Sequence, residues 1–191
     1  MRNLTKTLEL LAGSVLWFGS KLFWYLYRAY QMSLFKKCGE SVYIGRNCDF
    51  TYKNTTIGNN VYIGNNACLK SAHGKIVIGN HVMLGPNVHI HGGNHNYDLI
   101  GIYMTDNHSK NPDEDGVVKI CDDVWIGSGA YIMKGVTVGE GSVIGACTIV
   151  LKDVAPYSII MGSLERKISR RFDKNSLAKH KMSIQKSHLQ S

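Results

Sequence analysis

The apolar residues in the middle of the chain recur at every sixth position. Twelve such positions fall into three runs; all are aliphatic, and glycine follows directly in seven of the twelve cases. They are Ile57, Ile63 and Leu69; Ile78, Leu84 and Ile90; and Ile120, Ile126, Ile132, Val138, Ile144 and Val150. Neither a helix, with about 3.6 residues per turn, nor a plain strand, with a period of about two, keeps this register. The pattern therefore predicts short flat faces that stack into a parallel β-helix, with the aliphatic side chains inside and Gly or Asn at the corners.

The first part of the chain has the period of a helix instead. Apolar residues between Leu4 and Ala29 are spaced three or four apart, as on one face of an amphipathic helix. The longest uncharged run, from Leu10 to Ser20, is eleven residues, whereas a membrane span needs about 20. Two interpretations stay open: a cap that packs on the main domain, or a basic, aromatic helix that lies on a membrane surface.

These periods divide the chain into three parts. We expect an N-terminal amphipathic helical segment at 1–37, a β-helix at 38–160 with an inserted loop at about 93–117, and a C-terminal segment at 161–191. For the C-terminal segment we expect a basic tail and a short helix near Ser163–Phe172. That helix would cover the open strand edge at the end of the coil stack.

The positive charge of the chain lies at its two ends. The net charge is +8; residues 1–37 carry six basic and one acidic side chain, residues 38–161 eight and eleven, and residues 162–191 eight and two. Basic ends can bind nucleic acid, an anionic membrane surface or a phosphorylated ligand, or can be solvated tails. The five cysteines form no CxxC pair, which indicates reduced thiols in a cytoplasmic protein rather than disulfides or structural zinc.

The six-residue period breaks after Ile90, where the inserted loop leaves the coil. A loop expelled from a rigid scaffold is free to carry function. The stretch in which the loop begins, "NVHIHGGNHNYD", contains His89, His91 and His95. Strand alternation places His89 and His91 on the outer surface, either as ordinary surface histidines or as part of a cleft wall. A smaller break, "SAHGK", contains His73.

Three motifs resemble those of the hexapeptide-repeat acyltransferases, in particular the branch of maltose and galactoside (sugar) O-acetyltransferases and related xenobiotic acetyltransferases. They are "NHNYD" (94–98), "VWIGS" (124–128) and "GVTVGEGSVIGACTIVLKD" (135–153), and the resemblance extends from Ile57 to about Arg171. It implies an all-β, left-handed parallel β-helix with three faces per coil, and a homotrimer with active sites between subunits. The closing motif departs from the branch, because "GSLER" (162–166) replaces Gly-Asn-Pro-Ala-[Lys/Arg].

The resemblance implies an acetyl-coenzyme A-dependent O-acetyltransferase that acts directly on a hydroxyl of a sugar or glycan precursor, with no nucleic acid partner and no metal. His95 takes the catalytic position, and histidine suits a general base because its ordinary pKa is about 6.5. The coenzyme-binding residues implied are Trp125, Ser128, Ala146, Lys152 and Arg166. The acceptor-binding residues implied are Asn65, His73, Asn94 and Trp125.

The position of Trp125 can also be inferred from the coil itself, because an indole does not fit inside so narrow a coil. We expect it to face outward beside the emerging loop and to form a wall for the acceptor or the pantetheine arm. The apolar N-terminal helix adds the hypothesis of peripheral contact, through residues 1–30, with the inner face of the cytoplasmic membrane.

Three alternatives stay open at this point. A xenobiotic (antibiotic) O-acetyltransferase would use the same chemistry on another acceptor. A γ-class carbonic anhydrase-like enzyme needs three histidine ligands for zinc, and the spacing His91-x3-His95 could supply two. A non-catalytic scaffold would explain the basic ends, but not a histidine at the mouth of the longest loop.

Overall fold

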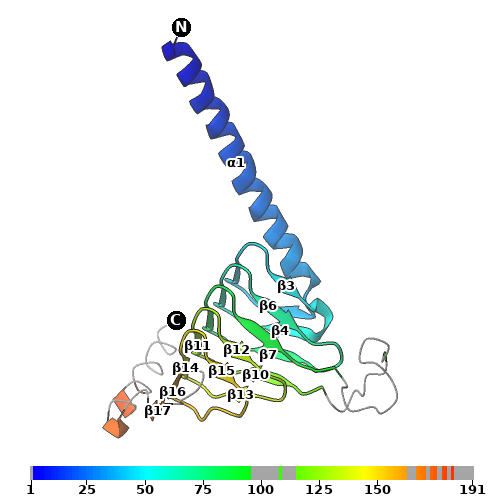
Figure 1. Ribbon diagram of the computed structural model, residues 1–191, viewed down its shortest axis with the longest axis vertical. Coiled ribbons are helices and arrows are strands. Elements are labelled where there is room, and N and C mark those ends of the chain that lie inside the picture. The colour runs from blue at the N-terminus through cyan, green and yellow to red at the C-terminus, as the bar shows by residue number, and fades with distance from the viewer. Residues whose placement is uncertain are drawn as a thin grey trace.

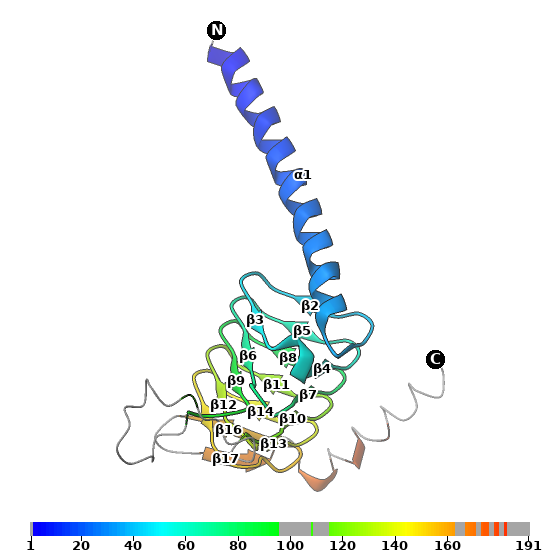
Figure 2. The same ribbon diagram turned by 90° about the vertical axis from the view of Figure 1, so that its right-hand side faces the viewer.

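The chain forms one long helix followed by a stack of short strands (Figure 1). The structure is a computed structural model, and it describes residues 2–95, 108, 115–162, 167–170, 173–175, 178–179 and 182. Three parallel sheets make the three sides of a continuous coil (Figure 2). The predicted left-handed parallel β-helix is confirmed.

The three sides of the coil, which we call faces A, B and C, follow one another along the chain. Face A contains β1 (Lys37–Cys38), β4 (Thr55–Ile57), β7 (Ile76–Ile78), β10 (Val118–Ile120) and β13 (Thr137–Val138). Face B contains β2 (Tyr43–Ile44), β5 (Tyr62–Ile63), β8 (Met83–Leu84), β11 (Trp125–Ile126), β14 (Val143–Ile144), β16 (Ser158–Met161) and β17 (Lys167–Arg170). Face C contains β3 (Asp49–Phe50), β6 (Cys68–Lys70), β9 (His89–His91), β12 (Tyr131–Ile132) and β15 (Ile149–Val150). The corners between faces form the A–B, B–C and C–A edges.

The interior of the coil is filled by the residues that the six-residue period identified. All twelve periodic aliphatic side chains are buried, with exposed fractions between 0% and 2%. Each such side chain stabilises the fold by about 1.5–3 kcal/mol relative to leaving it in water. The prediction that these side chains point inward is therefore confirmed, and the residues directly before them are exposed or half-buried.

At several corners the glycine does not adopt the left-handed backbone conformation that the sequence pattern suggests for it. The glycines that follow the aliphatic residues are needed because coils approach closely: a Cβ on Gly58 would lie 2.5 Å from the carbonyl oxygen of Gly79. The left-handed backbone instead occurs two residues later, at Asn60, Asn66 and Asn87, with φ between +56° and +57°. Asparagine tolerates this conformation better than most residues, so glycine and asparagine have separate tasks at these three corners.

The helix α1 (Arg2–Leu34) meets the coil only at its C-terminal end (Figure 2). There Gln31, which is 2% exposed, donates a hydrogen bond from Nε2 to the Tyr52 hydroxyl at 3.2 Å, and Phe35 packs edge-on against Phe50 and Tyr52. Farther out the side chains are open to solvent, with Leu16 74% exposed. The interpretation of α1 as a cap packed along the main domain is therefore wrong beyond the last turns. Among the residues that the structure describes, no helix is both long and apolar enough to cross a membrane.

The other end of the coil is covered by a strand. β17 folds back antiparallel on β16, with Ser158 opposite Arg170 and Met161 opposite Lys167. The prediction of a short helix near Ser163–Phe172 is wrong over these residues, and helical residues occur only later, at 174–175, 178–179 and 182 in the described part. A bare strand edge is satisfied most completely by another strand, because β17 supplies backbone partners that a helix cannot offer.

Candidate active site

The C–A edge is where the coil departs from regularity. Three successive coils carry extra residues there: the 3-10 turn η1 (Tyr52–Asn54), the stretch 71–75, and the insertion that leaves after β9 and returns before β10. The insertion closes on itself at its base, because the Gly116 backbone N–H donates to the Gly92 carbonyl at 3.0 Å. We call residues 92–93 and 115–116 the neck of the insertion.

An aspartate anchors the neck to the preceding coil. Oδ2 of Asp115 accepts a hydrogen bond from the backbone N–H of His73 at 2.8 Å. The same carboxylate occupies the space of a Cβ at Gly93, so a larger residue there would displace the Asp115 side chain. The neck therefore fixes the point from which Asn94 and His95 leave the coil.

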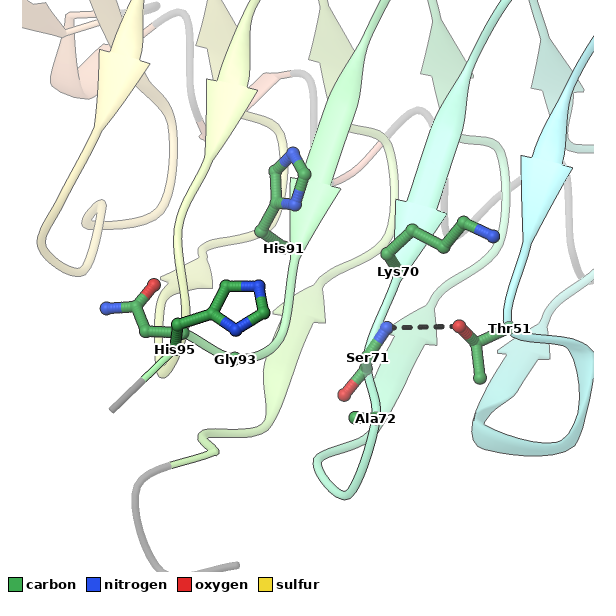
Figure 3. Close-up of a pocket in the computed structure, with 8 residues that line it drawn as sticks. Thr51, Lys70, Ser71, Ala72, His91, Gly93 and His95 are labelled. Atoms are coloured by element: carbon green, nitrogen blue, oxygen red, sulfur yellow. Dashed lines mark hydrogen bonds between the residues drawn. The ribbon is translucent and has the colours of Figure 1, made fainter. Parts of the chain in front are cut away.

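A cavity of about 470 Å³ lies beside the neck (Figure 3). It is lined by residues of three successive coils: Thr51, then Lys70, Ser71 and Ala72, then His91, Gly93, Asn94 and His95. Small-molecule sites commonly occupy about 300–1,000 Å³. Figure 3 shows the rings of His91 and His95 near each other at the end of β9, with His95 exposed to solvent.

His91 belongs to a cluster of three parallel rings on face C. Its ring centroid lies 5.8 Å from that of His89 and 6.3 Å from that of Tyr131, and His89 stacks on Tyr131 at 4.5 Å. The interplanar angles are between 5° and 8°. Burial, and secondly the neighbouring His89, lower the pKa of His91 below its ordinary value, so that the ring is uncharged at neutral pH.

The preceding coil contributes polar groups to the same cavity. Lys70 pairs with His91 in the strand register, and its Nζ lies 2.5 Å from Oδ1 of Asp49. Both side chains are open to solvent, so this ion pair contributes at most about 1 kcal/mol. The Ser71 backbone N–H donates to Oγ1 of Thr51 at 3.2 Å, and Oγ of Ser71 is buried without a partner among the described residues.

Comparison with known proteins places the chain in a family. Residues 118–152 match the family described as Bacterial transferase hexapeptide (six repeats). A galactoside O-acetyltransferase of Lactococcus lactis subsp. lactis (strain IL1403) is 33% identical over 150 residues, which cover 73% of this chain and 68% of that protein. The chain belongs to the hexapeptide-repeat acetyltransferases.

Other members of the family show the same likeness in structure or in part of the sequence. A hexapeptide-repeat-containing acetyltransferase of Vibrio cholerae O1 biovar eltor, solved in complex with acetyl coenzyme A, has a TM-score of 0.67 and 28% identity, with 76% of each chain covered. A chloramphenicol acetyltransferase of Agrobacterium fabrum is 52% identical over 63 residues, 33% of this chain and 30% of that protein. The chain spans between 30% and 43% of the length of the first curated relatives that it matches.

Within this hexapeptide-repeat acetyltransferase, the residues expected to bind the acceptor are only partly brought together. Asn94 and His95 line the cavity, and His73 lies at the same edge one coil earlier. Asn65 lies elsewhere, at the B–C edge, where its Oδ1 accepts a hydrogen bond from the Arg46 backbone N–H at 2.8 Å. Within one chain Asn65 does not reach the cavity.

Trp125 faces outward as expected, with 52% of its surface exposed. Within one chain it does not line the cavity beside the neck from which the loop leaves. The loop returns to face A, and Trp125 lies one corner farther on, in β11 of face B. There it lines a separate hollow of about 310 Å³ with His81, Met83, Asp123, Val124 and Val143.

The other residues expected to bind coenzyme A fall on two edges. Ser128 and Ala146 are exposed at the B–C edge on adjacent coils. These two coils are joined by a hydrogen bond from the Cys147 backbone N–H to the Ser128 carbonyl, at 2.9 Å. Lys152 is exposed at the C–A edge, after β15. Arg166 lies outside the described residues. A single chain therefore does not gather this set around His95.

Sequence reasoning missed part of the cavity wall. The sequence pattern alone does not identify Thr51, Lys70 and Ser71, and it leaves His91 open between two interpretations. One signal could have found them, since Thr51 and Ser71 each begin an irregular C–A corner, and the parallel register pairs Lys70 with His91. The structure places no group of three or more His, Cys, Asp or Glu side chains suited to a metal ion among the residues it describes.

Proposed function

We propose that this hexapeptide-repeat acetyltransferase transfers an acetyl group from acetyl-coenzyme A to a hydroxyl of a sugar or glycan precursor. The observation that carries the proposal is the position of His95, exposed in the cavity and two residues from the anchored neck. A galactoside O-acetyltransferase among the relatives and a solved relative in complex with acetyl coenzyme A support this choice of acceptor and donor.

In the proposed reaction His95 acts as the general base. Its imidazole takes the proton of the acceptor hydroxyl while the hydroxyl oxygen attacks the thioester carbonyl. The carbon–sulfur bond then breaks, the acetyl group stays on the acceptor, and the sulfur of coenzyme A receives the proton from His95. The exposed residues Ser128 and Ala146 and the cation of Lys152 would hold the donor.

We also propose that the active site lies between subunits of a homotrimer. This would explain why Trp125, Ser128 and Ala146 lie on the side of the coil away from His95. Face B also exposes an apolar column at corresponding positions of successive coils, namely Tyr43, Tyr62, Met83 and Trp125. In a mixture of refolded His95→Ala and Trp125→Ala chains, sites with both native residues form, so activity should exceed that of either variant alone; no recovery would contradict a shared site.

The proposed activity is tested by coenzyme A thiol release with sugars, nucleotide sugars and hydroxylated antibiotics as acceptors. His95→Ala should lower kcat by about 10²- to 10⁴-fold while acetyl-coenzyme A still binds, as measured by calorimetry. His89→Ala, on face C and outside the cavity lining, is the matched control and should behave as the wild type. Near-normal turnover of His95→Ala would exclude His95 as the base, and stoichiometric zinc in purified protein would favour a carbonic anhydrase-like enzyme instead.

A second candidate function is acetylation of an antibiotic. It is favoured by the 52% identity to a chloramphenicol acetyltransferase over 63 residues. Chloramphenicol therefore belongs in the acceptor panel beside galactosides and maltose. A kcat/KM for chloramphenicol above that for every sugar would replace the sugar proposal with this one.

We propose, finally, a cytoplasmic protein that touches the inner face of the membrane through residues 1–30. α1 exposes Val15, Leu16 and Phe18, and Lys21 lies over the Trp17 ring at 3.6 Å. Apolar and aromatic side chains with interspersed cations favour binding at an anionic lipid surface. The double change Leu16→Glu and Phe18→Glu should abolish co-sedimentation with phosphatidylglycerol vesicles and leave transfer to a soluble acceptor unchanged; unaltered co-sedimentation would exclude this contact.

A further inference from the structure

His91 is the second imidazole of the cavity that contains His95. It ends β9, and its neighbour Ile90 is fully buried, so the side chain of His91 points out of the coil. The neck begins directly after it. Both rings therefore reach the same 470 Å³ space from a short stretch of backbone that the coil and the neck hold at two points (Figure 3).

The ring of His91 is held in one orientation. It lies parallel to His89 on its own strand and to Tyr131 on the next coil, with interplanar angles of 8° and 7°. Lys70 occupies the corresponding place on the preceding coil. A side chain confined in this way loses little freedom when a ligand binds, and preorganisation of this kind is what a selective contact requires.

The chemistry of this ring matches a hydroxyl group. Burial and His89 lower the pKa of His91, so one ring nitrogen donates a hydrogen bond and the other accepts one. A sugar hydroxyl likewise donates and accepts. A site that is built to hydrogen-bond a particular hydroxyl discriminates strongly against molecules that place no hydroxyl there.

We propose that His91 is a specificity-determining residue of the acceptor site: it hydrogen-bonds a second hydroxyl of the acceptor and thereby selects which hydroxyl meets His95. The inference rests on the proposed transferase function and adds regioselectivity to it. A general base alone takes the proton of any hydroxyl that comes within reach. A second fixed contact leaves one orientation of the acceptor, and so one position of acetylation.

His89 provides a matched control for this role. It lies on the same strand and the same outward face, and it belongs to the same ring cluster. His91 lines the cavity and His89 is not among the residues that do. His89→Phe therefore keeps a ring in the stack and removes no polar group from the acceptor site.

The experiment compares His91→Phe, His91→Asn and His89→Phe with the wild type. Methyl galactoside, maltose and chloramphenicol serve as acceptors, because each offers more than one hydroxyl. His91→Phe keeps a ring but loses both nitrogens, and should raise the acceptor KM by about 3- to 10-fold with the coenzyme A KM unchanged. NMR of the product should show a mixture of positional isomers where the wild type gives one.

The conservative variants separate a hydrogen bond from a packing effect. His91→Asn should restore part of the acceptor KM and of the selectivity, because its amide still donates and accepts. His89→Phe should match the wild type in both. If a variant does not fold, a second experiment on the wild type takes its place. The imidazole NMR signals of the wild type are recorded with and without saturating acceptor, which should shift the His91 signals more than the His89 signals.

The outcomes distinguish this inference from the proposed function. If the wild type transfers acetyl and His91→Phe retains the wild-type KM and product, the inference is wrong and the transferase function stands. The same holds if bound acceptor leaves the His91 signals unmoved. If none of the three acceptors is acetylated or bound by the wild type, the proposed function and the inference fail together.

Discussion

The A–B and C–A edges belong to the same coil and are built in opposite ways. At the A–B edge, the side-chain oxygens of Asn59, Asn80 and Asp122 on successive coils each accept a hydrogen bond from a backbone N–H of the preceding coil, at 2.8–2.9 Å. At the C–A edge, extra residues interrupt the spacing three times, and a cavity lies between them.

The difference shows how one coil can combine a rigid frame at the A–B edge with a ligand cavity at the C–A edge. At the A–B edge the polar side chains are used to hold the coils together. At the C–A edge the corresponding task is performed by the neck, where Asp115 binds the backbone of His73. The remaining polar groups, including His91 and His95, face the cavity. Regularity along one edge thus fixes the frame on which the other edge presents its side chains.

The largest expected effect tests whether the coil under the irregular edge is packed as tightly as elsewhere. Ile90 is the last interior side chain before the insertion, and Ile144 lies in the regular part; both are fully buried. Ile90→Ala and Ile144→Ala should each lower the free energy of unfolding by about 2–5 kcal/mol, measured by urea denaturation. A much smaller loss for Ile90→Ala would mean that the coil is loose where the cavity forms.

The interior and the exit of the loop could be predicted from the sequence because both depend on local spacing. A strict six-residue register leaves one way to bury Ile57 through Val150, and its interruption marks where the chain leaves the coil. For the same reason His95 was singled out by the break itself. The placement of His95 in the cavity agrees with that choice, while its role as the base stays a prediction.

Other features depend on contacts that spacing does not encode. The same apolar pattern in α1 suits a helix packed on the coil and one that stands away from it. Residues 167–170 form a strand because β16 offers them an edge, which no local propensity reveals. Trp125 faces outward as the narrow coil requires, but one corner of the coil turns it onto face B, away from the neck. His91 needed the register with Lys70 and the neighbouring rings to be recognised as part of the wall.

The second prediction removes the anchor of the irregular edge. Asp115→Ala deletes the acceptor for the His73 N–H and the carboxylate that packs at Gly93. Without this anchor His95 should shift relative to the acceptor, and a displacement of about 1 Å can lower the rate about 10²-fold. We therefore expect kcat to fall by about that factor at saturating acceptor, although His95 itself is unchanged. The measurement is steady-state thiol release, with the melting temperature as control. Loss of stability without loss of kcat in the folded fraction would show that the neck does not position His95.

The third prediction makes the equivalent change at the regular edge. Asp122 accepts hydrogen bonds from the backbone N–H and the side-chain Nδ2 of Asn80, at 2.8 and 3.1 Å. Asp122→Ala leaves the Asn80 groups without this partner and should lower the free energy of unfolding by about 1–3 kcal/mol. Turnover per folded molecule at 25 °C should stay at the wild-type value, and a selective loss of kcat would contradict the division of tasks between the two edges.

The smallest expected effect concerns the pH dependence of stability. The pKa of His91 is lowered in the folded chain, by burial first and by His89 second, whereas in the unfolded chain it is about 6.5. Between these two values the unfolded chain binds more protons, so this contribution to stability is complete above about pH 6.5 and is lost as the pH falls toward the folded pKa. Lys70 on β6, Tyr131 on β12 and His95 in the same cavity are the other titratable groups that face the ring among the described residues.

His91→Phe removes this titration and keeps a ring in the cluster. The free energy of unfolding should therefore fall less between pH 8 and pH 5.5 in His91→Phe than in the wild type, as measured by urea denaturation at both pH values. His89→Phe removes the second cause of the lowered pKa of His91, so its dependence on pH should lie between the two. An equal fall in the free energy of unfolding in all three proteins would contradict this expectation. It would mean that the His91 ring is as open to water as a surface histidine, and that the cavity wall at the C–A edge is no more ordered than the solvent-exposed corners of the coil.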